Sequence, residues 1–388
     1  MSQPPLFQPI TIRSITAKNR IVISPMCQYS ATDGLVNDWH LVHLGKFAQG
    51  GAGIVMTEAV AVSPQGRITH GDLGLWHDDQ IDPLARIAAF LRDNGAVPAI
   101  QLAHAGRKAS MQRPWFGNGA LSEADIRRGD LPWPVVAPSP IAVDQGWLTP
   151  LELSEDDLDT LTEQWRLATL RAADAGFELL EVHCAHGYLL HSFLSPLSNR
   201  RDDQYGGSRE DRMRFPLEII ETVRAAWPDT LPLSVRISSV DGVEGGLTLS
   251  DSIAFAREAK ARGVDIIDCS SGGLLGSATS AQQPRGYGFQ VPFAETIRNE
   301  VDILTMAVGL IVHPDQAEAI LEHGQADLIA IGREALFDPN WPLHAQLELG
   351  GDSDQLFADW PQQYGWWLER REPALRQLDG RKLPYRRN

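Results

Sequence analysis

Cysteine is scarce in this chain of 388 residues, which contains only Cys27, Cys184 and Cys269. Such an odd and sparse set gives no disulfide framework and favours a reducing compartment, so we expect a cytoplasmic protein. The sequence has no Cys-x-x-Cys pair, which argues against an iron–sulfur cluster or a structural zinc module.

Long apolar runs and an excess of positive charge are also missing. No apolar stretch approaches the ~18 residues of a membrane-spanning helix, and the amino terminus lacks the pattern of a signal peptide. The 50 acidic and 34 basic residues give a formal charge of −16, which argues against a nucleic-acid surface. The sequence also lacks a GxGxxG turn for a dinucleotide. We therefore expect small-molecule partners, with neither nucleic acid nor membrane.

Short apolar runs, rich in valine and isoleucine, recur along the chain between glycine, proline and polar residues. Continuously apolar runs are typical of strands that are buried on both faces of a parallel sheet. The eight expected strands cover residues 21–26, 53–60, 97–104, 177–184, 231–237, 264–270, 303–309 and 327–332.

Helical segments separate these strands. Ser154, followed by two acidic residues, is a typical helix N-cap, and Gly176 is a typical stop. Further helices are expected over residues 250–262 and after residues 313–315. The alternation predicts an α/β fold, a single (β/α)₈ TIM barrel over residues 1–370, with a C-terminal extension over 371–388. A doubly wound open sheet is the alternative.

Two long irregular segments follow the third and sixth expected strands, over residues 107–149 and 271–288. Loops of this length in a compact domain are usually functional. Both follow the carboxyl ends of strands, which form the active-site face of a barrel.

The richest chemistry follows the fourth expected strand, where His183, His186 and Tyr188 lie within six residues. Imidazoles can hold a substrate oxygen on which negative charge develops, and a phenol can give a proton to a neighbouring carbon. The alternative is a metal-assisted aldolase or hydrolase that uses the histidine pair. Since no Asp, Glu or Cys completes a ligand set at the usual spacing, we expect no metal.

Glycine-bearing turns follow the seventh and eighth expected strands, at Gly309 and at Gly332-Arg333. In barrels this pair of loops commonly binds phosphate through backbone N–H groups, and Arg333 adds a charged contact. The alternative is that the glycines only allow tight turns and that Arg333 is solvated.

Four motifs occur in a characteristic order, at residues 24–29, 101–108, 183–188 and 199–208. With them the chain resembles the old yellow enzyme family of flavin-dependent ene-reductases, from about residue 19 to Arg333. It is closest to the branch with xenobiotic reductase and the thermophilic-like NADPH dehydrogenases. The resemblance implies non-covalent FMN in the barrel mouth and NAD(P)H as the reductant.

The resemblance also implies which residues hold the flavin. Cys27 would touch the flavin and tune its potential, and inert packing is the alternative. Arg236 would favour the negative charge of the reduced flavin. The matching residues along the ring, at its pyrimidine edge and around its phosphate are Ser24, Pro25, Met26, Cys27, Ala59, Gln101, Arg236, Gly309, Gly332 and Arg333.

For the substrate, the resemblance implies that His183 and His186 bind the carbonyl or nitro oxygen of an activated alkene. Hydride would reach the β-carbon from the flavin, Tyr188 would protonate the α-carbon, and Tyr29 would line the substrate side. Enones, enals, maleimides and nitroalkenes are the expected substrates. A flavin-binding redox sensor without turnover is a further alternative.

The C-terminal segment is aromatic where a tail is normally polar, with Trp366 and Trp367 before Arg370. Some relatives insert a C-terminal arginine from a neighbouring subunit into the active site, and others use a tryptophan there. We expect Trp367 to line or border the substrate pocket and the subunits to form a homodimer or homotetramer. Residues 371–388 are expected to form an extended strap or a disordered end.

Overall fold

The computed structural model describes residues 3–276, 284–350 and 356–379. Within these ranges eight parallel strands form a closed barrel, in the spatial order β3-β13-β12-β11-β10-β9-β6-β4, with β4 pairing back to β3. Closure excludes the open sheet and confirms the predicted barrel. The strands are β3 (Ile21–Ile23), β4 (Ile54–Ala61), β6 (Val97–Ala103), β9 (Leu179–Cys184), β10 (Leu233–Ser238), β11 (Ile266–Ser270), β12 (Leu304–Ala307) and β13 (Leu328–Ile331).

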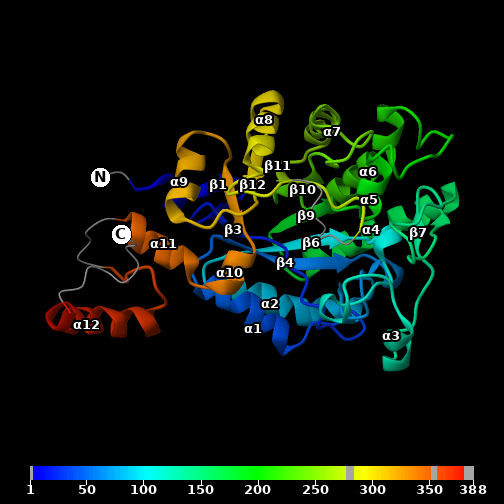
Figure 1. The fold of residues 1–388 in the computed structure, drawn as a ribbon. Helices are drawn as coiled ribbons and strands as arrows, with labels where there is room; N and C mark the ends of the chain where they lie inside the picture. The colour runs from blue at the N-terminus through cyan, green and yellow to red at the C-terminus, as the bar shows by residue number, and fades with distance from the viewer. Residues whose placement is uncertain (1–2, 277–283, 351–355, 380–388) are drawn as a thin grey trace.

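Helices surround this barrel (Figure 1). They are α1 (Asp38–Gln49), α2 (Ile81–Asp93), α4 (Glu155–Asp174), α6 (Arg209–Ala226), α7 (Leu249–Ala261), α8 (Val291–Val301), α9 (Pro314–Glu322), α10 (Arg333–Phe337) and α11 (Trp341–Leu349). Local sequence explains α4, because the Ser154 hydroxyl accepts the Asp157 N–H at the helix start. Its buried residues include Leu158, Leu161 and Trp165, which lie on one helical face against the barrel.

An antiparallel hairpin packs against the lower end of the barrel, where the strands begin. It consists of β1 (Ile10–Ile12) and β2 (Ile15–Ala17). Its isoleucines share one buried cluster with Val22, Met56, Val97 and Leu328 of the barrel strands. Burial of one isoleucine side chain contributes roughly 1.5–3 kcal/mol to the free energy of folding. The buried isoleucines of the hairpin therefore stabilise this end of the barrel.

The segment over 107–149 is long but well anchored. It contains α3 (Glu123–Arg128) and β7 (Val136–Ala137), which pairs with β8 (Leu151–Glu152). Both β7 and η4 (Gly106–Lys108) contact α5 (Leu189–Leu194), the short helix that follows β9. In the other long segment, residues 277–283 lie outside the described residues.

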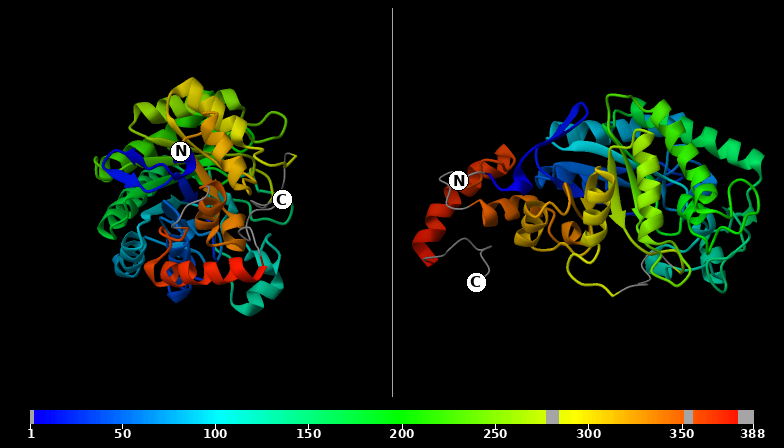
Figure 2. Two further views of the ribbon diagram at one scale, coloured as in Figure 1. Left: turned by 90° about the vertical axis from the view of Figure 1, so that its left-hand side faces the viewer. Right: turned by 90° about the horizontal axis from the view of Figure 1, so that it is seen from above.

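The C-terminal segment departs from the expected strap. Helix α12 (Gln362–Asp379) runs through the expected boundary between residues 370 and 371 and includes Pro373 in its interior. Helical backbone therefore replaces extended backbone at least as far as Asp379. Figures 1 and 2 show α12 beyond α11, at the end of the molecule opposite α3.

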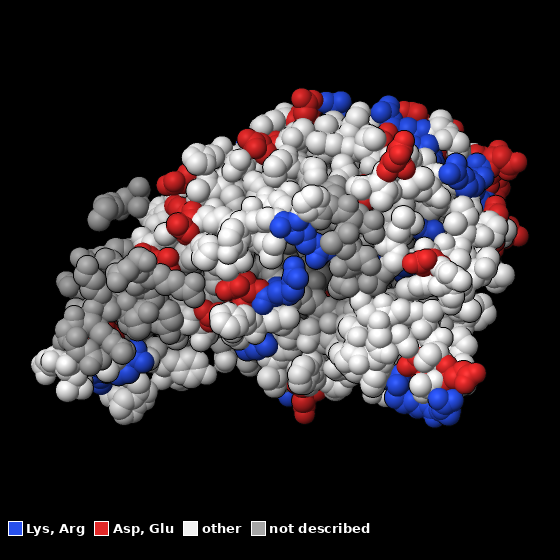
Figure 3. Space-filling model, in the orientation of Figure 1, with Lys and Arg blue, Asp and Glu red and all other residues white. Residues whose placement is uncertain are grey.

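None of the described helices is long and apolar enough to cross a membrane. Acidic and basic side chains are interspersed on the face seen in Figure 3, and basic ones border its central hollow. The visible charge is therefore mixed rather than gathered into one basic surface.

Candidate active site

The interior row of β9 carries the first site residues. Leu180, Val182 and Cys184 pack outward with the helices, so the alternate residues Glu181 and His183 face the barrel interior. Gln101 pairs in register with Glu181, and Arg236 pairs with both His183 and Asp268. Parallel strands thus bring these polar side chains to the same level, at the carboxyl end of the barrel.

The two histidines and the tyrosine form one cluster, as the motif predicts. The His183 ring lies 5.2 Å from the His186 ring and 5.0 Å from the Tyr188 ring, measured between centroids, with steep interplanar angles. A left-handed turn at His186 (φ 60°) and Gly187 (φ 76°) reverses the chain after β9. The turn therefore brings the second imidazole back beside the first.

Both imidazoles are neutral hydrogen-bonding groups. Burial, reinforced by the nearby Arg236 charge, holds the pKa of His183 and of His186 well below the ordinary value. His183 Nδ1 accepts the Ala185 N–H at 3.2 Å, so its proton resides on Nε2. His186 Nε2 lies 2.7 Å from the Ser270 hydroxyl. A neutral ring carries one N–H, so that of His183 is on Nε2, and that of His186 is on Nδ1 when the Ser270 hydroxyl donates to its Nε2.

Two phenols adjoin this pair. Burial, together with the nearby Cys27 and Asp72, holds the pKa of Tyr188 well above 10. The pKa of Tyr29 is raised as well, by burial first and then by Cys27 and Tyr188. Both phenols therefore remain protonated at neutral pH and can donate a proton.

A buried polar layer lies below the cluster, and sequence reasoning missed three of its residues, Glu181, Ser234 and Asp268. Gln101 Nε2 donates to Glu181 Oε1 at 2.8 Å, and the Ser234 hydroxyl donates to Glu181 Oε2 at 2.9 Å. Arg236 Nε lies 3.1 Å from Asp268 Oδ2. Burial, with the Asp268 charge, raises the pKa of Glu181 to about 8. The available signal was alternation, because Glu181 lies two residues before His183 on the same face.

The two strand ends expected to hold phosphate adjoin the strand end expected along the flavin, since β13 pairs with both β12 and β3. Gly309 has φ 119°, and a Cβ there would lie 2.9 Å from Gln290 Nε2, so glycine is required. A Cβ on Gly332 would lie 3.7 Å from Met26 Sδ and 3.8 Å from Ser24 Cβ. This turn therefore lies directly beside the segment expected along the flavin.

These residues fit a phosphorylated flavin. The Ser24 hydroxyl is buried and has no hydrogen-bond partner among the described residues, so it is available to a bound group. Residues 25–30 are half-buried, as expected for a segment that borders an opening, and Arg333 is exposed at the start of α10. Gln101 on β6 and Arg236 on β10 lie at the level of the mouth, on the two strands that flank β9.

Cys27 is half-buried beside these groups. Burial, with Asp72 and Glu58 adding, holds the pKa of its thiol well above the ordinary value. The thiol is therefore protonated at neutral pH, which argues against a nucleophile.

Lys108 has a structural position that its basic loop did not reveal. Its side chain is buried, and Nζ donates to the carbonyl oxygens of His186, at 2.9 Å, and Gly273. Burial, followed by the Arg107 charge, lowers the pKa of Lys108 to about 7. Lys108 thus ties the β6 loop to the loops after β9 and β11.

Trp367 lies apart from this site within one chain. Its side chain is 67% exposed on α12, and its ring packs edge-on against Trp366 at 4.5 Å. No contact joins Trp367 to the other site residues in the described part of the chain. Trp115 is instead an aromatic neighbour of the site, since its ring lies 5.9 Å from that of Tyr29.

Metal ligation finds no support in this geometry. Within residues 3–276, 284–350 and 356–379, no group of three or more His, Cys, Asp or Glu side chains could hold a metal ion. The histidine pair therefore lacks the further ligands that the metal-assisted alternative needs.

The barrel, the phosphate turns and the neutral histidine pair together define a TIM-barrel oxidoreductase of the flavin-dependent class. The model of the NADH:flavin oxidoreductase / NADH oxidase family matches residues 5–350, so the chain belongs to this family, which includes the old yellow enzymes. The protein is an NAD(P)H-dependent flavin oxidoreductase that uses FMN.

Similar proteins agree in length and fold. The chain is 46% identical to an NADPH dehydrogenase of Geobacillus sp. (strain WCH70) over 347 residues, which cover 89% of this chain and 94% of that one. It is 45% identical to an NADPH dehydrogenase of Bacillus subtilis (strain 168), covering 89% and 95%. Morphinone reductase shares the fold with a TM-score of 0.74 at 24% identity, covering 93% and 96%. An old yellow enzyme homologue from Zymomonas mobilis does so with 0.72 at 24%, covering 94% and 98%.

Proposed function

We propose that this protein is an ene-reductase, which reduces the carbon–carbon double bond of activated alkenes with electrons from NAD(P)H. The observation that carries the proposal is the buried cluster of two neutral imidazoles and a protonated phenol at the barrel mouth. Enones, enals, maleimides and nitroalkenes fit it, because each carries an oxygen conjugated to the double bond. Bound FMN supplies the hydride that NAD(P)H has delivered.

The histidines hold the substrate oxygen. His183 donates through Nε2–H, since its Nδ1 is engaged by the Ala185 N–H. His186, whose ring is perpendicular to that of His183, donates through Nδ1–H in the tautomer in which its Nε2 accepts the Ser270 hydroxyl. Two donors on one oxygen withdraw electrons from the β-carbon and stabilise the negative charge that develops on the oxygen. In comparable sites the loss of one such donor costs roughly 10²–10³ in rate.

Tyr188 supplies the proton. Its ring adjoins that of His183, so the phenol lies beside the bound oxygen and within reach of the neighbouring carbon. The high pKa of Tyr188 keeps the proton in place until carbanion character develops at the α-carbon. Tyr29 lines the same side of the pocket and is held edge-on by Trp115.

The polar layer and the strand ends would hold FMN. Arg236 would stabilise the negative charge that the flavin ring gains on reduction, and Asp268, 3.1 Å from its Nε, would moderate that positive charge. The full set that we propose for the cofactor is Ser24, Pro25, Met26, Cys27, Ala59, Gln101, Arg236, Gly309, Gly332 and Arg333.

We also propose that the chain assembles as a homodimer or homotetramer. Trp367 is 67% exposed on α12, which lies at the end of the molecule opposite α3, so we infer that it borders a pocket of a neighbouring subunit. Light scattering on the purified protein tests the assembly, and a monodisperse monomer would contradict it.

The test of the activity is an anaerobic absorption experiment. NADPH should bleach the yellow, FMN-loaded protein, and 2-cyclohexenone should restore the colour as the ketone is formed. In the Tyr188→Phe variant bleaching should persist, whereas reoxidation by 2-cyclohexenone should slow by roughly 10²–10⁴, the usual contribution of a proton donor. A wild-type protein that bleaches without reoxidation would support the redox sensor, and loss of turnover on treatment with a chelator would support the metal-assisted alternative.

A further inference from the structure

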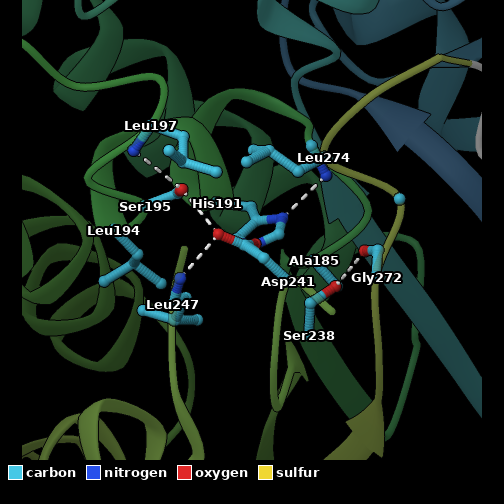
Figure 4. A network of polar contacts seen from close by, with 12 residues as sticks. Ala185, His191, Leu194, Ser195, Leu197, Ser238, Asp241, Leu247, Gly272 and Leu274 are labelled. Atoms are coloured by element: carbon cyan, nitrogen blue, oxygen red, sulfur yellow. Dashed lines mark hydrogen bonds and ion pairs between the residues drawn. The ribbon is translucent and has the colours of Figure 1, made fainter. Parts of the chain in front are cut away.

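A third histidine, His191, lies beside the left-handed turn at His186 and Gly187. His191, on α5, and Asp241, in the loop after β10, are both completely buried. His191 Nδ1 accepts the N–H of Gly187 at 2.8 Å, and its Nε2 lies 2.9 Å from Asp241 Oδ1, at an angle outside the usual hydrogen-bond range. Figure 4 shows Asp241 between His191, Ser195 and Leu247. The pair thus contacts the turn through the Gly187 N–H.

These contacts determine where the protons are. Because Gly187 donates to Nδ1 of His191, the ring carries its proton on Nε2, facing Asp241. The other carboxylate oxygen of Asp241 accepts the Ser195 hydroxyl and the Leu247 N–H, each at 2.7 Å. Burial raises the pKa of Asp241, but His191, Ser195 and Leu247 lower it further. Asp241 is therefore an anion that fixes the tautomer of His191.

The turn needs such support. His186 is a non-glycine residue in the left-handed region, which costs roughly 1–2 kcal/mol. Its N–H donates to the Ser238 hydroxyl at 2.9 Å, and Ser238 in turn donates to the Gly272 carbonyl. Its carbonyl oxygen accepts from Lys108. The N–H of Gly187 is the remaining polar group of this peptide, and His191 is its acceptor.

We propose that the His191–Asp241 pair is the positioning device of the active site. It holds the Gly187 N–H, and through it the left-handed turn that carries His186 and Tyr188 toward the substrate. His191 acts through this backbone contact and is a positioning residue. The inference rests on the proposed function, since the geometry it protects is that of the oxygen donors and the proton donor.

Three substitutions separate this role from general packing. His191→Leu is similar in size but removes the acceptor for Gly187. His191→Asn retains an acceptor, Oδ1, close to the position of Nδ1. Asp241→Asn keeps its carbonyl oxygen toward the Leu247 N–H and turns its NH₂ toward His191 Nε2. The proton of His191 then moves to Nδ1, where it opposes the Gly187 N–H, so removal of one distant charge should be as harmful as the leucine.

The experiment follows two reoxidations of the chemically reduced, FMN-loaded enzyme under anaerobic conditions. 2-Cyclohexenone needs His186 and Tyr188, whereas ferricyanide takes electrons without an oxygen donor or a proton donor. We expect His191→Leu and Asp241→Asn to slow the first reaction by roughly 10²-fold, the effect of a displacement of about 1 Å. The ferricyanide rate and the FMN affinity, titrated by fluorescence, should not change, and His191→Asn should recover most of the rate.

Each other outcome has a definite meaning. The inference is overturned if the leucine variant retains the wild-type rate with 2-cyclohexenone, if the ferricyanide rate falls in proportion, or if asparagine rescues no better than leucine. If the leucine variant does not fold, Asp241→Asn, which preserves shape, decides by the same selective loss. Wild-type enzyme that 2-cyclohexenone cannot reoxidise refutes the proposed function instead, whatever the variants do.

Discussion

Glu181 gives the sharpest prediction of this structure, because its proton couples stability to pH. The carboxyl is completely buried in the barrel interior, where burial and the Asp268 charge raise its pKa from 4.5 to about 8. The unfolded chain releases this proton near pH 4.5, whereas the folded chain retains it up to about pH 8. Between these values the folded state binds more protons, so the stabilising contribution is complete below pH 4.5 and is lost as pH rises to 8.

The magnitude follows from the proton count. One proton held only by the folded state lowers the free energy of unfolding by about 1.4 kcal/mol for each pH unit. Between about pH 5.5 and about pH 7.5 this amounts to roughly 3 kcal/mol. Glu181→Gln removes the titration and can keep both hydrogen bonds, because its amide oxygen can accept from Gln101 and its NH₂ can donate to Ser234.

The assay is reversible urea unfolding at both pH values with a fixed excess of FMN, in wild type and in Glu181→Gln. The variant should lose roughly 3 kcal/mol less than wild type over this interval. Glu178→Gln is the matched control, since Glu178 lies just before β9, partly exposed and paired with Arg92 at 2.5 Å. Equal pH dependence in wild type and Glu181→Gln would refute the buried, protonated carboxyl.

Two further predictions concern the mouth. Gly187→Ala should lower the free energy of unfolding by about 2 kcal/mol or more and abolish reoxidation by enones, because its Cβ would lie 2.5 Å from the Gly273 carbonyl oxygen at φ 76°. Gly207→Ala, at φ 82° with nothing within 4 Å of the new Cβ, should cost only about 1 kcal/mol in the same urea titration. Cys27 should react only slowly with iodoacetamide at neutral pH, followed by mass spectrometry, because its pKa is raised, and fast stoichiometric alkylation would contradict a protonated thiol.

Particular residues show how much of the fold and of the site can be predicted from the sequence. Apolar runs located all eight strands, because strands buried on both faces are apolar throughout, and the strand-end rule correctly gathered His183 with Arg236. The same continuous burial hid which residues face inward, so Glu181 was read as part of an apolar run. His191 escaped notice because its partner Asp241 is fifty residues away and meets it only where the adjacent strands β9 and β10 end.

The prediction for the C-terminal segment was wrong for another reason. The proline and arginine content of residues 371–388 indicated an extended strap or a disordered end, yet the backbone is helical through Asp379. A helix can accept an interior proline if it bends there or forgoes one hydrogen bond, and local propensity does not record that tolerance.

The hairpin β1–β2 has a consequence for how the molecule opens. It completes an apolar layer at the lower end of the barrel, whereas the layers above it are polar and the upper loops carry the chemistry. Local opening requires little loss of apolar contact at the mouth and a large loss at the hairpin. Backbone amides of the strand starts should therefore exchange with solvent last, and those near the catalytic turn earlier. Local motion, ligand exchange and tolerated substitutions can then concentrate at the mouth of the barrel, while the hairpin end preserves the fold.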